Sequence, residues 1–77
     1  MIKENIIKVS NYLNEIGIKH ENTENSILVD RDSICKWANL GEQESYNELR
    51  RTLCDKFNST FIYTFKTDEW LMLEKIA

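Results

Sequence analysis

The sequence predicts one small α+β domain, residues 1–77, in the order helix, strand, helix, helix, strand, strand. Three observations predict it. A chain of 77 residues has room for a single core. Its residues are 42% hydrophobic and 30% charged, which is the composition of an ordinary globular protein. Segments with helical spacing of apolar residues are interspersed with segments typical of strands, and there is no proline and only two glycines.

The first predicted element is an amphipathic helix over residues 2–16. Its apolar residues recur at steps of four and three, which places them on one face. These residues are Ile2, Ile6, Val9, Leu13 and Ile16. Gly17 then follows as a residue free to take the left-handed conformation, and Ile18 supplies an apolar contact back onto the last turn.

A short strand and a second helix come next. Ile27-Leu28-Val29 is rich in β-branched residues and predicts a buried strand, with residues 18–21 as a weak hairpin partner. Either Asp30 or Asp32 can cap the helix that follows, since a carboxylate accepts hydrogen bonds from the free N–H groups of the first turn. This helix is expected to end at Leu40-Gly41.

The third predicted helix begins at a capping-box pattern. Ser45 stands at the cap and Glu48 three residues later, so each side chain can bond a backbone N–H near the other. The helix is expected to run to about Asn58. Its apolar stripe consists of Tyr46, Leu49, Leu53 and Phe57.

The C-terminal part predicts a β-hairpin. Residues 61–65 have the composition and alternation of a strand, whereas residues 70–76 are compatible with a strand or a helix. A helix there would give the order α-β-α-α-β-α. We favour the hairpin, with a two-residue turn at Thr67-Asp68. That turn would pair Phe65 with Trp70 and Tyr63 with Met72 on one face, and Ile62 with Leu73 on the other.

The order of these elements resembles that of a winged helix-turn-helix domain. The resemblance implies that the third helix enters the major groove of DNA and that the terminal hairpin is the wing. It also implies a dimeric transcriptional regulator that reads DNA with Asn47, Arg50 and Arg51.

The charges oppose this DNA-binding alternative. The net charge is −3, whereas nucleic-acid binders usually carry a basic excess. On the outward face of the third helix, Arg51 is the only cation. Glu48 and Asp55 lie three residues before it and four residues after it, spacings that pair charges on a helix.

Acidic loops and the C-terminal aromatic residues predict a protein-binding surface instead. Six acids and two bases lie between residues 21 and 44, so converging loops would attract a basic partner. An apolar face of the hairpin would suit a partner or a homodimer, with aromatic anchors. The candidate partner-binding residues are Asp30, Asp32, Glu42, Glu44, Tyr63 and Trp70.

The sequence shows no pattern for catalysis, a metal or a cofactor. His20 is the only histidine and is expected in an exposed polar loop, and Cys35 and Cys54 are expected to be free, partly buried thiols. Neither a glycine-rich phosphate loop nor a zinc pattern occurs. No apolar run approaches the roughly 20 residues that span a bilayer, and the N-terminus lacks a signal-peptide core. We therefore expect a cytoplasmic protein without membrane association.

Together these features predict a small, non-enzymatic regulatory or inhibitory protein that acts by binding another protein. Its size, acidity and lack of catalytic patterns are typical of the small inhibitors and accessory proteins that phages and mobile elements encode. A winged-helix DNA-binding regulator is the alternative.

Overall fold

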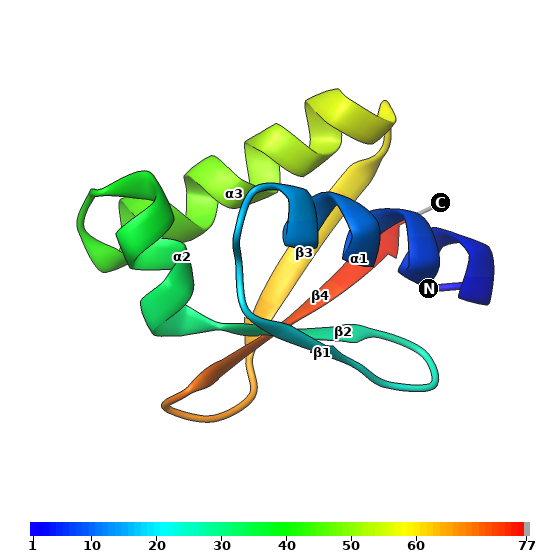
Figure 1. Cartoon of the computed structure of the whole chain (residues 1–77), viewed down its shortest axis with the longest axis horizontal. Helices are drawn as coiled ribbons and strands as arrows, with labels where there is room; N and C mark the ends of the chain where they lie inside the picture. Colours follow the sequence, from blue (N-terminus) through cyan, green and yellow to red (C-terminus); the bar gives the residue numbers. More distant parts are fainter. Residues whose placement is uncertain (77) are drawn as a thin grey trace.

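Three helices and four strands make up the computed structural model, which describes residues 1–76 (Figure 1). The elements are α1 (Lys3–Glu15), β1 (His20–Asn22), β2 (Ile27–Asp30), α2 (Arg31–Ala38), α3 (Glu42–Phe57), β3 (Thr60–Phe65) and β4 (Trp70–Ile76). The predicted α+β class is confirmed, and residues 70–76 form a strand as favoured. The observed order has one strand more than predicted, because the weak hairpin partner of β2 is a strand of its own.

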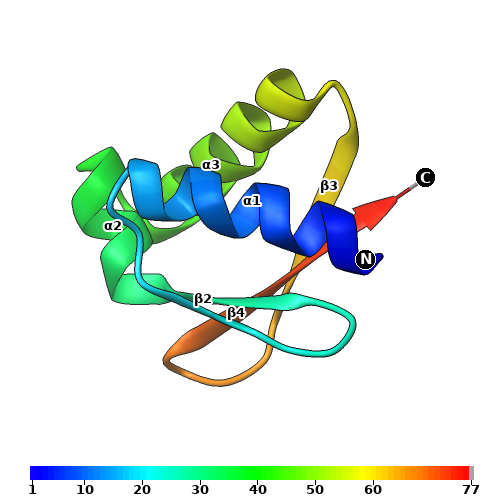
Figure 2. The ribbon, with the colours of Figure 1, turned by 45° about the vertical axis from the view of Figure 1, so that its right-hand side comes forward.

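The four strands form one antiparallel sheet in the order β1-β2-β4-β3. The last strand of the sequence, β4, therefore lies inside the sheet between β2 and β3. All three helices lie on the same side of this sheet, as the two ribbon views show (Figures 1 and 2).

The hydrophobic core lies between the helices and the inner face of the sheet. The helices contribute most of their predicted stripes, although Ile2 is 65% exposed. Strands β2 and β4 contribute alternate residues, and β3 contributes Phe61. The core comprises Ile6, Val9, Leu13, Ile18, Ile27, Val29, Ile34, Tyr46, Leu49, Leu53, Phe61, Leu71 and Leu73.

Helix α1 ends as its sequence predicts. Gly17 has a φ of 79°, in the left-handed region that a residue without Cβ adopts freely. Its N–H donates to the Asn14 carbonyl at 3.2 Å, and the N–H of Ile18 donates to the Leu13 carbonyl at 2.9 Å. These two bonds satisfy carbonyls that the helix would otherwise leave free, and Ile18 is buried in the core.

Asp30, rather than Asp32, is the cap of α2. Its carboxylate accepts a hydrogen bond from the N–H of Ser33 at 3.0 Å. Helix α2 ends at Ala38, and Asn39 takes the left-handed conformation with a φ of 56°. The predicted end at Leu40-Gly41 is therefore slightly too late.

The predicted cap of α3 at Ser45 is wrong, because the cap lies four residues earlier, at Gly41. Gly41 is the cap residue, and the N–H of Ser45 already makes a helical bond to the Gly41 carbonyl at 2.8 Å. The Ser45 side chain is fully buried, and its hydroxyl donates to the Leu40 carbonyl at 3.1 Å. Glu42 and Glu44 occupy the first turn, where negative charge favours the helix.

The register of the terminal hairpin differs from the predicted one by one residue. Phe65 lies opposite Leu71, and Tyr63 lies opposite Leu73. The connection is longer than two residues because the hydroxyl oxygen of Thr67 accepts hydrogen bonds from the N–H groups of Glu69 and Trp70, each at 3.1 Å. Since side chains alternate between the faces of a strand, the shift moves Trp70 to the face opposite Phe65.

Candidate functional site

The outer face of the sheet carries a group of apolar side chains that no helix of the described chain covers (Figure 2). Leu28 of β2 lies opposite Met72 of β4, and Met72 lies opposite Thr64 of β3. Neighbouring positions on the same face hold Trp70 and Ile62. We call Leu28, Ile62, Trp70 and Met72 the open face.

Three of these side chains are half-buried but do not belong to the core. Leu28, Trp70 and Met72 are each half-buried, yet none packs against the buried residues of the core. Ile62 is 37% exposed at the edge of the group. A contiguous apolar patch of this kind on a small domain is typical of a surface that binds a partner.

Charges of both signs border the open face. Glu21 lies opposite Leu28, and Glu74 lies opposite Ile62. Lys66 and Lys19 lie near Trp70. The N–H of Lys66 donates to the Trp70 carbonyl at 3.0 Å. The Lys19 carbonyl accepts a hydrogen bond from the N–H of Asp30, which lies opposite Trp70. Asp30, Asp68 and Glu69 also lie near Trp70, so a complementary partner surface has an apolar centre and basic groups near Glu21 and Glu74.

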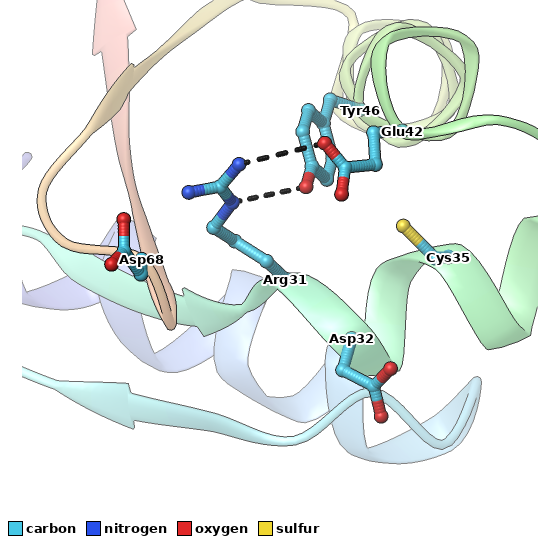
Figure 3. A pocket seen from close by; sticks show the side chains of 6 residues that line it. All are labelled: Arg31, Asp32, Cys35, Glu42, Tyr46 and Asp68. Carbon is cyan, nitrogen blue, oxygen red and sulfur yellow. Dashed lines mark hydrogen bonds and ion pairs between the residues drawn. The ribbon is translucent and has the colours of Figure 1, made fainter.

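A group of polar and charged side chains surrounds Arg31 at the start of α2 (Figure 3). Its Nε donates to the Tyr46 hydroxyl at 3.0 Å, and its Nη1 donates to the Thr67 carbonyl at 3.1 Å. Its Nη2 lies 3.8 Å from the Glu42 carboxylate. The guanidinium carbon is 4.8 Å from the centre of the Phe65 ring, close enough for a cation–π contact.

Arg31 therefore joins α2, α3 and the β3–β4 turn, beside a pocket of about 240 Å³. The pocket is lined by Arg31, Asp32, Cys35, Glu42, Tyr46 and Asp68. The hydrogen bond to Tyr46 raises the pKa of Arg31, and Glu42 and Asp68 act in the same direction. Burial raises the pKa of Tyr46. Three carboxylates beside one guanidinium disfavour an anionic ligand. We therefore interpret these residues as structural: they hold α2, α3 and the β3–β4 turn together.

The acids of the predicted partner surface do not come together in one place. Asp30 caps α2, and Asp32 pairs with Lys36 at 2.9 Å. Glu42 lies beside Arg31, and Glu44 is exposed in the first turn of α3. The hairpin between β1 and β2, which holds other acids of this segment, lies at the far end of the molecule from the α2–α3 connection (Figure 1).

The two predicted aromatic anchors lie on opposite faces of the sheet. Trp70 belongs to the open face, whereas the Tyr63 ring stacks edge-on against Tyr46 on the helix side. The Tyr63 hydroxyl donates to Asn47 Oδ1 at 3.1 Å and accepts a hydrogen bond from Gln43 Nε2 at 2.6 Å. The expectation that Tyr63 and Met72 share a face is wrong, because it rested on the shifted register.

The residues proposed to read DNA do not form one exposed group. Asn47 is held by Tyr63, and Arg50 is half-buried. Arg51 is exposed and bonds Glu48 at 2.9 Å, as the three-residue spacing predicted. Among these side chains, only Arg51 is fully exposed, and its charge is already paired.

His20 links α1 to β1 and is half-buried, which corrects its predicted exposure. Its Nδ1 lies 2.9 Å from the Ile18 carbonyl, which can only accept, so Nδ1 carries the proton. Its Nε2 then accepts the hydroxyl of Ser10 at 2.7 Å. Asn22 Nδ2 donates to the same Ser10 oxygen at 3.3 Å. Within this cluster Ser10 is 8% exposed, His20 is half-buried and Asn22 is exposed.

The remaining candidate chemistry is sparse in the part of the chain that the structure describes. Cys35 and Cys54 are free and half-buried, as expected, and Cys54 Sγ accepts a hydrogen bond from the N–H of Phe61 at 3.3 Å. Over residues 1–76, no three histidine, cysteine or acidic side chains gather as metal ligands. None of the described helices has the length and apolar character needed to cross a membrane.

Sequence reasoning identified Trp70 but missed Leu28 and Met72 as members of the candidate site. The residues of β4 are apolar on both faces from Trp70 to Leu73, so alternation alone could not separate the core face from the outer one.

Comparison with known proteins gave no match to a family model, a curated protein or a solved structure.

Proposed function

We propose that this chain is a small, non-enzymatic regulatory or inhibitory protein that acts by binding another protein through the open face of its sheet. The observation that carries the proposal is the state of Leu28, Trp70 and Met72. They are half-buried, lie outside the core and belong to the face of the sheet on which no helix packs. Burial of such a patch against a partner removes apolar area from water and so favours association.

The chemistry of the partner follows from the border of the open face. Glu21 beside Leu28 and Glu74 opposite Ile62 favour basic groups on the partner. Trp70 is the expected anchor, because large aromatic side chains near the centre of interfaces carry much of the binding energy.

Affinity capture from a nuclease-treated lysate, followed by a binding titration with the captured protein, tests the proposal. Trp70→Ala is expected to weaken binding about 30-fold, which corresponds to a loss of about 2 kcal/mol at an interface anchor. Met72→Lys is expected to weaken it as well, because it places an unpaired charge in the apolar contact. Circular dichroism checks that both variants remain folded.

Glu44→Lys is the matched control, since Glu44 is exposed on the helix side of the molecule. Normal binding by Glu44→Lys and weak binding by Trp70→Ala would support the open face. The opposite pattern would place the interface on the acidic start of α3 and contradict the proposal. Analytical sedimentation of the chain alone tests whether a second copy binds the open face. A dimer that dissociates in Trp70→Ala would mean that the open face mediates self-association and does not bind a different protein.

The DNA-binding alternative has less support. The first turn of α3, which would enter the groove, carries Glu42 and Glu44, and the β3–β4 turn carries Asp68 and Glu69. These charges repel a phosphate backbone. Titration of labelled duplex DNA at low salt tests this alternative directly, and binding that weakens steeply with added salt would favour it over the protein-binding proposal.

A further inference from the structure

One edge of the sheet, at β1, has backbone groups that face away from the sheet. The N–H of Asp30 donates to the Lys19 carbonyl and the N–H of Thr23 to the Ser26 carbonyl, both at 2.9 Å. In this segment, the odd-numbered residues therefore direct their N–H and C=O groups toward β2. Because an antiparallel strand alternates, His20 and Asn22 turn their N–H and C=O groups outward. Over residues 1–76, these groups bond no other backbone group.

A partly apolar groove runs beside this free edge. It has a volume of about 450 Å³ and lies between the first half of α1 and the end of β1. Its lining residues are Lys3, Ile6, Ile7, Asn22, Thr23 and Glu24. Ile7 is 50% exposed in the middle of α1, where a side chain that packed only on its own core would be covered. The free edge and the groove thus adjoin at Asn22.

We propose that an extended peptide segment of a partner protein adds to β1 as a fifth, antiparallel strand. Its backbone bonds the outward groups of His20 and Asn22, as peptides do when they extend an exposed sheet edge. The side chains opposite these two residues point to the helix side of the sheet, where Ile6 and Ile7 form the groove wall. The side chain between them points to the other side, opposite Glu21.

This geometry specifies the peptide as apolar, basic, apolar at three successive positions. The apolar residue opposite Asn22 enters the groove, the one opposite His20 lies beside it on the helix side, and the basic residue pairs with Glu21 across the strands, where opposite charges stabilise a sheet. A second copy of this chain fits less well. In the register that pairs His20 with Asn22 of the other copy, Glu21 lies opposite Glu21, and like charges at opposed positions are destabilising.

The other sheet edge, at β3, lacks the same combination of features. The first outward N–H of β3, that of Phe61, is already bonded by Cys54 of α3. The pocket near that end has a volume of only about 90 Å³. The groove lies on the helix side of the sheet, so the apolar contacts of the peptide are separate from the open face, and only Glu21 borders both.

The probe for this proposal is a fluorescently labelled octapeptide that alternates valine and lysine. Its control has four valines followed by four lysines, which gives the same composition without the alternation. Fluorescence polarisation with the full chain measures binding, and NMR measures hydrogen exchange of the His20 and Asn22 amides. The alternating peptide is expected to bind more tightly than the control and to slow exchange at both amides.

Ile7→Asp is expected to weaken binding of the alternating peptide about tenfold or more. Ile62→Asp, at an exposed isoleucine of the open face, is the matched control and is expected to bind normally. Equal binding of the two peptides, unchanged exchange at His20 and Asn22 at saturation, or normal binding by Ile7→Asp would each overturn the proposal. Trp70→Ala leaves this binding intact, so its outcome is separate from that of the proposed function.

Discussion

Removal of the Asp30 carboxylate is expected to destabilise the fold through α2. Asp30→Ala deletes the acceptor that bonds the N–H of Ser33 at 3.0 Å and leaves that N–H at the start of the helix without its partner. Asp30→Asn keeps an oxygen that can accept this bond but removes the negative charge. Comparing the stability of the chain with Asp, Asn or Ala at position 30 therefore separates the contribution of the hydrogen bond from that of the charge at the helix start.

The magnitude follows from these two contributions. Loss of a capping side chain costs about 1 kcal/mol, and loss of a negative charge at a helix start costs about 0.3–1 kcal/mol. Asp30→Ala should thus lower the free energy of unfolding by about 1–2 kcal/mol, and Asp30→Asn by less than about 1 kcal/mol. In a domain of this size, 1 kcal/mol corresponds to about 4–8 °C in melting temperature.

Urea and thermal unfolding followed by circular dichroism and tryptophan fluorescence measure these differences. Asp32→Ala is the matched control, because Asp32 lies two residues later, is exposed and makes only a surface ion pair with Lys36. The reasoning is refuted if Asp30→Ala is as stable as the unmodified chain. It is also refuted if Asp32→Ala destabilises as much as Asp30→Ala, which would make charge near the helix start, and not the cap, the source of the effect.

Two further perturbations test the core and the Tyr46 environment. Phe61→Ala is expected to lower the free energy of unfolding by about 3–5 kcal/mol, because Phe61 is fully buried. Ile62→Ala on the open face should change it by less than about 0.5 kcal/mol. Urea titration of both variants measures the difference. Because burial raises the pKa of Tyr46, the folded chain holds the phenolic proton more tightly than the unfolded chain, whose pKa is about 10. This contribution is complete below about pH 10 and is lost as the pH rises toward the folded pKa. Unfolding measured from about pH 8 to about pH 11 should show a smaller alkaline loss in Tyr46→Phe, and an equal loss would contradict the assignment.

Local sequence signals were sufficient for the parts of the fold that depend on one segment. The spacing of apolar residues located α1, and Gly17 marked its end because a left-handed residue is needed there. Asp30 was one of two candidates for the cap of α2, and only the structure shows which carboxylate meets Ser33.

The sequence-based predictions were wrong for features that depend on more than one segment. The pattern from Ser45 to Glu48 fits a capping box, but Gly41 and the acids after it allow the helix to begin earlier. Ser45 then becomes a buried residue whose hydroxyl bonds the Leu40 carbonyl. A cap pattern therefore indicates that a helix is near without fixing its first residue.

The candidate site depended on strand register, which local patterns specify weakly when both faces of a strand are apolar. Two hydrogen bonds to the Thr67 hydroxyl lengthen the β3–β4 connection and shift the pairing by one residue. That shift places Leu71 and Leu73 in the core and leaves Trp70 and Met72 outside. The sequence could identify Trp70 as an anchor, but its neighbours on the open face follow only from the pairing.

The position of β4 inside the sheet also sets the order in which the chain can fold. Its neighbours, β2 and β3, do not pair with each other, and both depend on a strand that is synthesised after them. During translation, α1 and the β1–β2 hairpin therefore emerge without the strand that completes their sheet. We expect a stable fold only after β4 has left the ribosome, because until then Ile27 and Val29 lack Leu73 and Leu71, the core residues opposite them in the sheet.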